Sequence, residues 1–348
     1  MTSDKKHHLR RAINYSFSFL LSIIFLYIAF KNANIEEVVH YVSNASWLWI
    51  WVFGIVLLFS HYLRALRWQI MLHSVKPDTS IKNIFGALMV GYGVNNVVPR
   101  AGEVSRAVLL GKWEGLSRSS MFGTVIVERV IDVIFLLLSV LVSVLIWSGN
   151  LYESFPWLKS ALIISFIGVA LFVAFLILVI KQKEKFYGGI IKLLGRFSIS
   201  LAHKSAHIFE MLAEGFTSLK GTRNYFLVIL LSVIMMLVYA GNAYIGFLTI
   251  GMQNVAPVSY KMAWVLMSIS AIGVAIPTPG GTGSYHTLAK STLVLLFGFG
   301  ENISLAFAFI SHIISYTLCI VVALIVFFVL NRQHESLKKV LDTEVDEL

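Results

Sequence analysis

Long apolar runs separated by short polar connections are the main pattern along this chain. Six of the runs reach the length of about 20 residues that a helix needs to cross a hydrocarbon core. Runs of this length are typical of transmembrane helices, because a helix bonds its own backbone polar groups away from water. The pattern therefore predicts an all-α polytopic membrane protein with full spans at about residues 12–30, 46–63, 120–147, 158–180, 224–250 and 302–330.

Two further apolar regions, residues 83–111 and 262–298, are interrupted near their middle. The first is broken by NNVVPRAG and the second by PTPGGTG, and three of the six prolines in the chain, Pro99, Pro277 and Pro279, lie in these breaks. Proline disrupts a helix interior, and glycine permits tight turns. We therefore interpret each region as a re-entrant helical hairpin, which enters the membrane and leaves it on the same side.

The basic residues predict which side of the membrane each connection faces, since loops rich in lysine and arginine stay in the cytoplasm. They gather at the N-terminus, in residues 64–82 and 181–223, and after residue 330, which places both termini in the cytoplasm. A full crossing by residues 83–98 would carry the next basic residues outside, and a hairpin avoids this. Two full crossings in place of each hairpin remain an alternative, although residues 99–119 contain no second apolar run long enough to cross the membrane.

The two halves of the chain, about residues 12–150 and 158–330, share one predicted order of elements. Each half has two spans, a hairpin and a third span, and the second half has the opposite orientation in the membrane. Inverted repeats whose broken helices meet near the midplane are typical of transporters. We predict a single membrane domain over residues 1–348, with an amphipathic helix on the cytoplasmic surface at about residues 185–219.

The composition agrees with a membrane protein. Hydrophobic residues make up 57% of the chain and charged residues 13%, and the mean hydropathy is +0.80. Basic loops that face anionic lipid headgroups explain the net charge of +10, so we expect no nucleic-acid partner. The basic N-terminus leads into an apolar run with no cleavage site, which predicts a retained first span. The chain has one cysteine and no spacing typical of metal ligands, so we expect no metal and no cofactor. We expect a multi-pass protein of the inner cell membrane.

Three charged residues, Glu128, Arg129 and Asp132, interrupt the run at residues 120–147 within the sequence VIVERVIDVIF. With a rise of about 1.5 Å per residue, they fall near the middle of a hydrocarbon core about 30 Å thick. Charges at this depth must be paired or hydrated, and Glu128 and Asp132 share one helix face. They form either a salt-bridge cluster that fixes the bundle or part of a polar path, and the two interpretations are compatible.

The first hairpin is predicted to turn at Pro99–Gly102, with a helix restarting at about Glu103. The N-terminus of that helix then points into the membrane, where its free N–H groups form an anion site. Arg100 and Arg106 add positive charge, unless they lie at the cytoplasmic edge beside lipid phosphate. Glu103 can pair with Arg106, three residues away, and Asn95 and Asn96 can bond to unwound backbone.

The second hairpin is predicted to turn between Pro277 and Gly283, through Pro279, Gly280 and Gly281. Ser284 is expected to cap the returning helix, on which His286 and Lys290 share a face. His286 is either a binding residue or a packed, satisfied side chain. Two inward helix N-termini with basic residues favour an anionic substrate group, such as a phospholipid headgroup or a polyprenyl phosphate.

The segments NNVVPRAGEVSRAVLL, VERVID and PTPGGTGSY resemble motifs in the membrane region of the lysylphosphatidylglycerol synthase family, the flippase-like domain of the multiple peptide resistance factor. The resemblance covers about residues 12–330 and implies a lipid translocator. At position 286 it implies an acidic residue, where this chain has a histidine. The residues on motif positions are Pro99, Gly102, Glu103, Arg106, Glu128, Arg129, Asp132, Pro279, Gly280, Gly281 and Gly283.

The resemblance also implies what the chain does not do. The aminoacyl-transfer domain of the family is missing from these 348 residues, so we expect no enzyme and no lysyl-phosphatidylglycerol synthesis. We expect translocation of an anionic phospholipid or a polyprenyl-phosphate-linked lipid. A membrane enzyme acting on lipid phosphates and a non-transporting assembly subunit are the alternatives. The expected partners are the lipid itself and either a second copy of the chain or a separate lipid-modifying enzyme.

Overall fold

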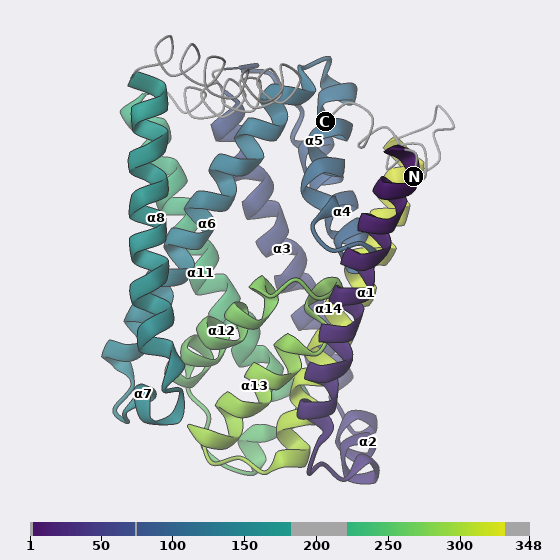
Figure 1. Cartoon of the computed structure of the whole chain (residues 1–348). Coiled ribbons are helices and arrows are strands. Elements are labelled where there is room, and N and C mark those ends of the chain that lie inside the picture. The colour runs from purple at the N-terminus through teal and green to yellow at the C-terminus, as the bar shows by residue number, and fades with distance from the viewer. Residues whose placement is uncertain (1–2, 74, 182–220, 331–348) are drawn as a thin grey trace.

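The computed structural model describes residues 3–73, 75–181 and 221–330, and their secondary structure is helical throughout (Figure 1). This confirms the all-α prediction for the described residues, and the predicted amphipathic helix at residues 185–219 lies outside them. The α-helices are α1 (Ser3–Phe30), α2 (Ile35–Ser43), α3 (Trp47–Leu72), α4 (Ile81–Val97), α5 (Ala101–Glu114), α6 (Arg118–Ile146), α7 (Leu151–Ser154), α8 (Trp157–Lys181), α11 (Thr222–Ile250), α12 (Tyr260–Ala275), α13 (Ser284–Leu295) and α14 (Glu301–Leu330), with short 3₁₀ helices η1 (Met252–Asn254) and η2 (Pro279–Gly281).

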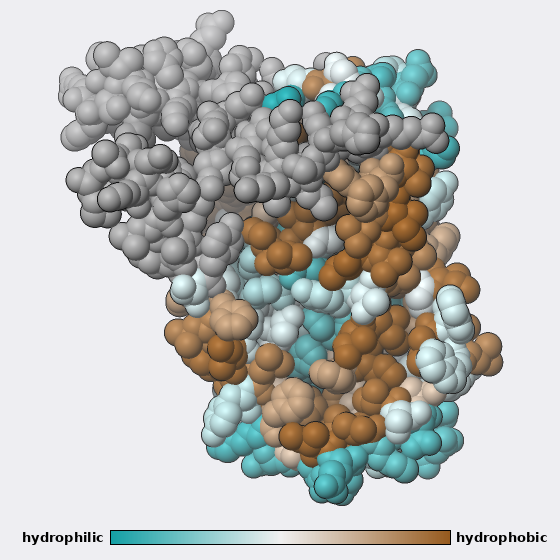
Figure 2. Space-filling model, turned by 90° about the vertical axis from the view of Figure 1, so that its right-hand side faces the viewer, coloured by the Kyte–Doolittle hydropathy of each residue, from teal (hydrophilic) through white to brown (hydrophobic). Residues whose placement is uncertain are grey.

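Within the described ranges, five helices, α3, α6, α8, α11 and α14, are long and apolar enough to cross a membrane. The count rises to six if Ser16–Phe30 of α1 and α2, which are bent by 90° at their junction, form one span. Many large apolar side chains on these helices are exposed, and apolar surface covers much of the middle of the face in Figure 2, with hydrophilic side chains gathered at its lower end. The chain is a polytopic membrane protein.

The long helices form one bundle, and the short helices occupy its two ends (Figure 1). The helix pair α4–α5 lies in the upper half of the view, and the pair α12–α13 lies in the lower half. The α3 helix packs against α11, and α14 packs against both α4 and α13. The two short-helix pairs therefore enter the bundle from opposite ends.

The chain reverses direction between α4 and α5 at the predicted break. Val98 is extended, as expected for a residue before proline, and this ends α4. Gly102 then lies against α4, where an added Cβ atom would stand 1.9 Å from the carbonyl oxygen of Gly91. The side chain of Asn95 accepts a hydrogen bond of 2.7 Å from the Gly102 N–H. Glycine is required here because only bare backbone allows this approach.

The second break has a similar close contact. An added Cβ atom on Gly273 of α12 would stand 2.6 Å from the carbonyl oxygen of Ser284, the first residue of α13. The Ser284 hydroxyl donates to the Gly273 carbonyl over 2.7 Å across eleven residues of chain. Gly91 and Gly102 are also eleven residues apart. In both short-helix pairs, the residues that make the closest backbone contact across the turn are thus eleven positions apart.

Candidate functional site

Two arginines at the end of α3 lie inside the bundle. We predicted that the apolar run ends at residue 63 and that Arg64 and Arg67 belong to a cytoplasmic loop. This was wrong, because α3 continues to Leu72, the Arg67 side chain is fully buried and the Arg64 side chain is 11% exposed. The two arginines are three residues apart and share one helix face. The helical spacing of apolar residues through LRALRWQIML is the sequence signal that we missed.

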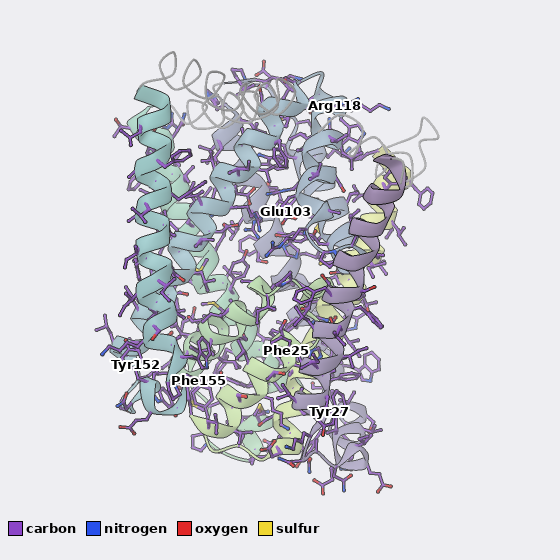
Figure 3. All side chains as sticks on the ribbon, in the orientation of Figure 1. Phe25, Tyr27, Glu103, Arg118, Tyr152 and Phe155 are labelled. Carbon is purple, nitrogen blue, oxygen red and sulfur yellow. The ribbon has the colours of Figure 1, made fainter. Side chains whose placement is uncertain are left out.

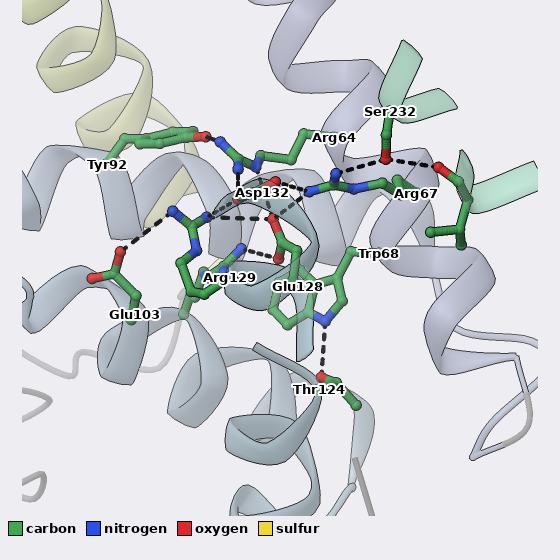
Figure 4. A network of polar contacts seen from close by, with 12 residues as sticks. Arg64, Arg67, Trp68, Tyr92, Glu103, Thr124, Glu128, Arg129, Asp132 and Ser232 are labelled. Carbon is green, nitrogen blue, oxygen red and sulfur yellow. Dashed lines mark hydrogen bonds and ion pairs between the residues drawn. The ribbon is translucent and has the colours of Figure 1, made fainter. Parts of the chain in front are cut away.

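These arginines meet the two predicted carboxylates of α6 (Figure 4). Glu128, whose side chain is fully buried, accepts from Arg64 Nε over 2.8 Å, and its second oxygen lies 2.7 Å from Arg106 Nη1. Asp132 accepts a 2.5 Å hydrogen bond from Arg67 Nη2 and a further one from Arg64. The predicted charges near the middle of α6 are therefore paired with arginines from α3 and α5.

Glu103 and Arg106 do not pair with each other, although we predicted that they would. Arg106 is directed to Glu128 and stacks on the Trp68 ring at 4.8 Å from its centroid. Glu103 lies 3.8 Å from Arg129 Nη1 and faces the middle of the bundle, whereas Arg118 lies at the upper end (Figure 3). Both α5 residues therefore pair with α6, which brings Glu128 to Arg106 and Arg129 to Glu103.

We define the arginine–carboxylate network as Arg64, Arg67, Arg106, Arg129, Glu103, Glu128 and Asp132. It contains four arginines against three carboxylates, so it holds one excess positive charge. Tyr92 and Ser232 accept hydrogen bonds of 2.6 Å and 2.9 Å from its two α3 arginines. Among the described residues, Arg106 Nη2 is buried and has no hydrogen-bond partner, and the same is true of Arg67 Nε and Arg129 Nε in the same network. A buried donor without a partner is costly, so each of these atoms favours an additional acceptor.

Arg106 also lines a small cavity. Its volume is about 10 Å³, on the order of the space that holds one water molecule. Of its lining residues, Arg129 is 37% exposed, and Glu103, 3.8 Å from it, is 24% exposed. The cavity is lined by Leu88, Gly91, Tyr92, Asn95, Gly102, Glu103, Arg106 and Arg129. A phosphate-sized group therefore enters only if α5 moves away from α4 and α6.

The predicted anion site at the start of α5 is altered by a side chain. Asn95 already accepts from the Gly102 N–H, so one of the free N–H groups of that helix end is occupied. Arg100 is exposed, adopts a left-handed backbone with φ of 67°, and lies outside the arginine–carboxylate network. The positive charge of this region therefore comes from arginine side chains more than from the helix terminus.

The turns of the two helix pairs lie next to each other. The Asn96 amide donates to the Tyr316 carbonyl over 3.2 Å, and the Tyr316 hydroxyl donates to the Asn96 carbonyl over 2.7 Å. A Cβ atom on Gly280, in the second turn, would stand 3.0 Å from the Asn96 side-chain oxygen. Asn96 thus binds backbone of α14, and it joins the first turn to the second.

Two histidines hold the second turn. The Gly283 N–H donates to His286 Nδ1 over 3.3 Å, and His312 Nε2 lies 3.2 Å from the Thr282 hydroxyl. The two imidazole rings are 4.6 Å apart between centroids. Ser284 does not cap α13 as predicted, because Gly283 occupies the N-cap position. His312 was not singled out from sequence, because the contact crosses from α13 to α14.

Lys290 has a structural environment separate from His286. Its ammonium donates to the Ala29 carbonyl over 2.8 Å, at the end of α1, and lies 2.5 Å from Glu301 at the start of α14. Lys290 therefore ties α1 to α14. The predicted residues divide into the arginine–carboxylate network near the first turn and a separate group at the second turn. Among the described residues, no group of three or more His, Cys, Asp or Glu side chains is placed to hold a metal ion.

The fold and the site define a class of protein. It is a polytopic helical bundle in which a buried charge network, with net positive charge, lies beside a broken helix. The sequence profile described as "Lysylphosphatidylglycerol synthase TM region" matches residues 15–342, and the chain belongs to this family. A "UPF0104 membrane protein" of Methanothermobacter thermautotrophicus is 29% identical over 73% of this chain and 77% of its own. Another, from Methanocaldococcus jannaschii, is 23% identical over 92% of this chain and 96% of its own.

Proposed function

We infer that this protein translocates an anionic lipid, either a phospholipid or a polyprenyl-phosphate-linked lipid, across the cell membrane. One observation carries the proposal: a buried network with excess positive charge includes Arg106, whose side chain lines a cavity and whose Nη2 has no hydrogen-bond partner among the described residues. An ionisable group at membrane depth marks a substrate or ion path by default. Membership of the lysylphosphatidylglycerol synthase transmembrane family agrees with a lipid substrate.

The topology that supports this function has six full spans, α1, α3, α6, α8, α11 and α14. The pairs α4–α5 and α12–α13 are then re-entrant hairpins from opposite sides, and both termini face the cytoplasm. Three observations support an inverted repeat: the opposite ends that the pairs occupy, the equal spacing of their closest backbone contacts and the hydrogen bonds between Asn96 and Tyr316, beside the second turn. In this arrangement a single membrane domain presents both turns to one polar path.

Exchange of ion pairs is the step by which the lipid phosphate enters. The 3.8 Å contact between Arg129 and Glu103 is the longest ion pair of the network, and it joins the two most exposed side chains of the network, both of which line the cavity. A phosphate that displaces Glu103 pairs with Arg129 and then reaches Arg106 as α5 moves. Paired arginines offset part of the cost of taking a phosphate into the bilayer, while the acyl or prenyl chains stay in lipid.

Reconstituted vesicles test this proposal. Fluorescent phosphatidylglycerol, placed in the inner leaflet, becomes accessible to an external quencher only after translocation. We expect the protein to accelerate this exchange, and we expect Arg106→Gln to slow it at least tenfold. Arg223→Gln, at an exposed position at the start of α11, is the matched control and keeps the normal rate. If no anionic lipid, phosphatidylglycerol or polyprenyl phosphate, moves faster than in protein-free vesicles under either pH gradient, the proposal is wrong.

A further inference from the structure

An apolar groove runs along the surface between α4 and α14, on the face of α4 turned away from the arginine–carboxylate network. Its volume is about 240 Å³. The α4 residues that line the network's cavity include Gly91 and Asn95, whereas those that line the groove include Val90 and Val94. Residues one position apart on a helix point about 100° apart, so the same helix separates a polar cavity from an apolar groove.

Both walls of the groove follow one helix face. The α4 wall is formed at positions 90, 93, 94 and 97, and the α14 wall at positions 320, 323, 324 and 327. This spacing of three and four places each set in a straight stripe. The two helices lie in close contact at Gly93, where an added Cβ atom would stand 2.6 Å from the Ala323 Cβ. Val90 and Phe327 form a buried floor, and Val97, at 69% exposure, stands at the open edge.

The groove continues into the first turn, where a positive charge is exposed. Val97 and Val98 line the groove, and Pro99 and Arg100 follow directly. Successive Cα atoms are about 3.8 Å apart, so the Arg100 Cα lies within about 8 Å of that of Val98. The turn lies near the middle of the bundle in Figure 1, and the exposed Arg100 side chain makes no hydrogen bond or ion pair with the described residues. An exposed cation at that depth favours an anion beside it.

We propose that this groove binds one acyl chain of an anionic phospholipid whose phosphate lies at Arg100. The inference rests on the proposed function, since it names the position in which the lipid waits beside the turn before its headgroup reaches Arg129. Two straight stripes with a glycine at a close contact between the helices suit an unbranched chain, whereas a polyprenyl chain carries a methyl branch in every unit. Contact between the phosphate and Arg100 gives the groove a preference for anionic phospholipids, which a general lipid-facing surface lacks.

Photolabelling of the full chain in vesicles tests this site. The vesicles consist of phosphatidylcholine with a trace of phosphatidylglycerol that carries a diazirine in the middle of one acyl chain. After illumination, mass spectrometry locates the adducts. We expect them on the groove residues at several times the yield found on Ile164 and Leu171 of α8, which are similarly apolar and exposed. We expect Arg100→Gln to remove this excess.

Two tryptophan variants provide a matched pair. Leu324→Trp fills the groove at its edge and is expected to lower the groove labelling several-fold. Ile325→Trp, the next residue and 56% exposed, lies outside the groove lining and is expected to leave the labelling unchanged. Phosphatidylcholine with the same diazirine should label the groove and α8 alike, because its headgroup has no net charge for Arg100.

Several outcomes would overturn the site. These are even labelling of all exposed helices, equal groove labelling by the two headgroups, stronger labelling by a diazirine polyprenyl phosphate, and cross-links between two copies across the groove. Translocation measured on the same vesicles separates the two claims. Normal translocation with even labelling rejects the groove alone, and focused labelling without translocation rejects transport alone.

Discussion

Neutralising Glu128 tests the energetics of the arginine–carboxylate network. The substitution Glu128→Gln keeps the shape of the side chain and removes its charge. Glu128 is fully buried and lies within 2.7–3.4 Å of four arginine side chains. Without it, the network changes from four arginines against three carboxylates to four against two. Breaking a buried pair by removing one partner costs about 3–5 kcal/mol, because the remaining charge is left uncompensated. We expect a loss of stability in that range.

A double variant separates the charge balance from the lipid site. Arg106→Gln combined with Glu128→Gln restores a single excess positive charge and removes both ends of one 2.7 Å pair. We expect the double variant to recover part of the stability that Glu128→Gln loses. We also expect it to remain deficient in translocation, because Arg106 is the group that meets the phosphate. A network with a purely structural role would instead let stability and translocation recover together.

Reversible unfolding in mixed micelles, followed by far-ultraviolet circular dichroism, measures these differences. Glu153→Gln is the matched control, because Glu153 is exposed and its nearest described partner is Asn150. Surface substitutions of this kind change stability by about 0.5 kcal/mol or less. The reasoning is refuted if Glu128→Gln unfolds at the same detergent fraction as Glu153→Gln, or if the double variant is less stable than Glu128→Gln alone.

Two further predictions concern the first hairpin. Gly102→Ala places a Cβ atom 1.9 Å from the Gly91 carbonyl oxygen, so we expect a large drop in melting temperature. Gly168→Ala, which has open space around it, should leave the melting temperature the same or slightly higher. Equal melting temperatures of the two variants would contradict the close contact. Burial raises the pKa of Glu114, but hydrogen bonds from Lys76, Asn83 and the Ser80 N–H outweigh it and hold the pKa below its ordinary value. The stability that Glu114 adds is therefore complete above that ordinary value and is lost as the pH falls through the lowered pKa. Glu114→Gln should reduce the loss of stability on acidification in the same unfolding assay, and an unchanged pH dependence would contradict this.

Local pattern was enough to predict the long helices and the two helix breaks of this fold, but neither the end of α3 nor the partners of its charges. Proline and glycine in NNVVPRAG and PTPGGTG indicated both helix breaks, and the place of Glu128 and Asp132 inside a long helix followed from the apolar run around them. Their main partners were missed. Arg64 is 64 residues from Glu128 in the chain, and no local signal reports a contact at that separation. A charge at the end of an apolar run looks like the start of a loop until its partner is known.

The same limit applies at the second turn. His286 was identified because it follows the glycines of that turn, while His312, which lies beside it, is 26 positions further along the chain inside an apolar run. Capping was assigned to Ser284 from residue type alone. In the structure its hydroxyl instead bonds to the Gly273 carbonyl, because α12 passes directly beside it. Packing between helices, which the sequence does not display, decides which of several possible acceptors a hydroxyl binds.

The central claim is that arginines of the network bind the phosphate of the translocated lipid. Solid-state measurement of phosphorus–nitrogen dipolar coupling tests it directly, with phosphatidylglycerol as the only phosphorus-containing lipid and arginine nitrogens labelled. We predict a coupling between the lipid phosphate and arginine guanidinium groups that falls in Arg106→Gln and in Arg129→Gln and persists in Arg223→Gln. A spectrum in which Arg106→Gln and Arg129→Gln leave the coupling unchanged would contradict the account.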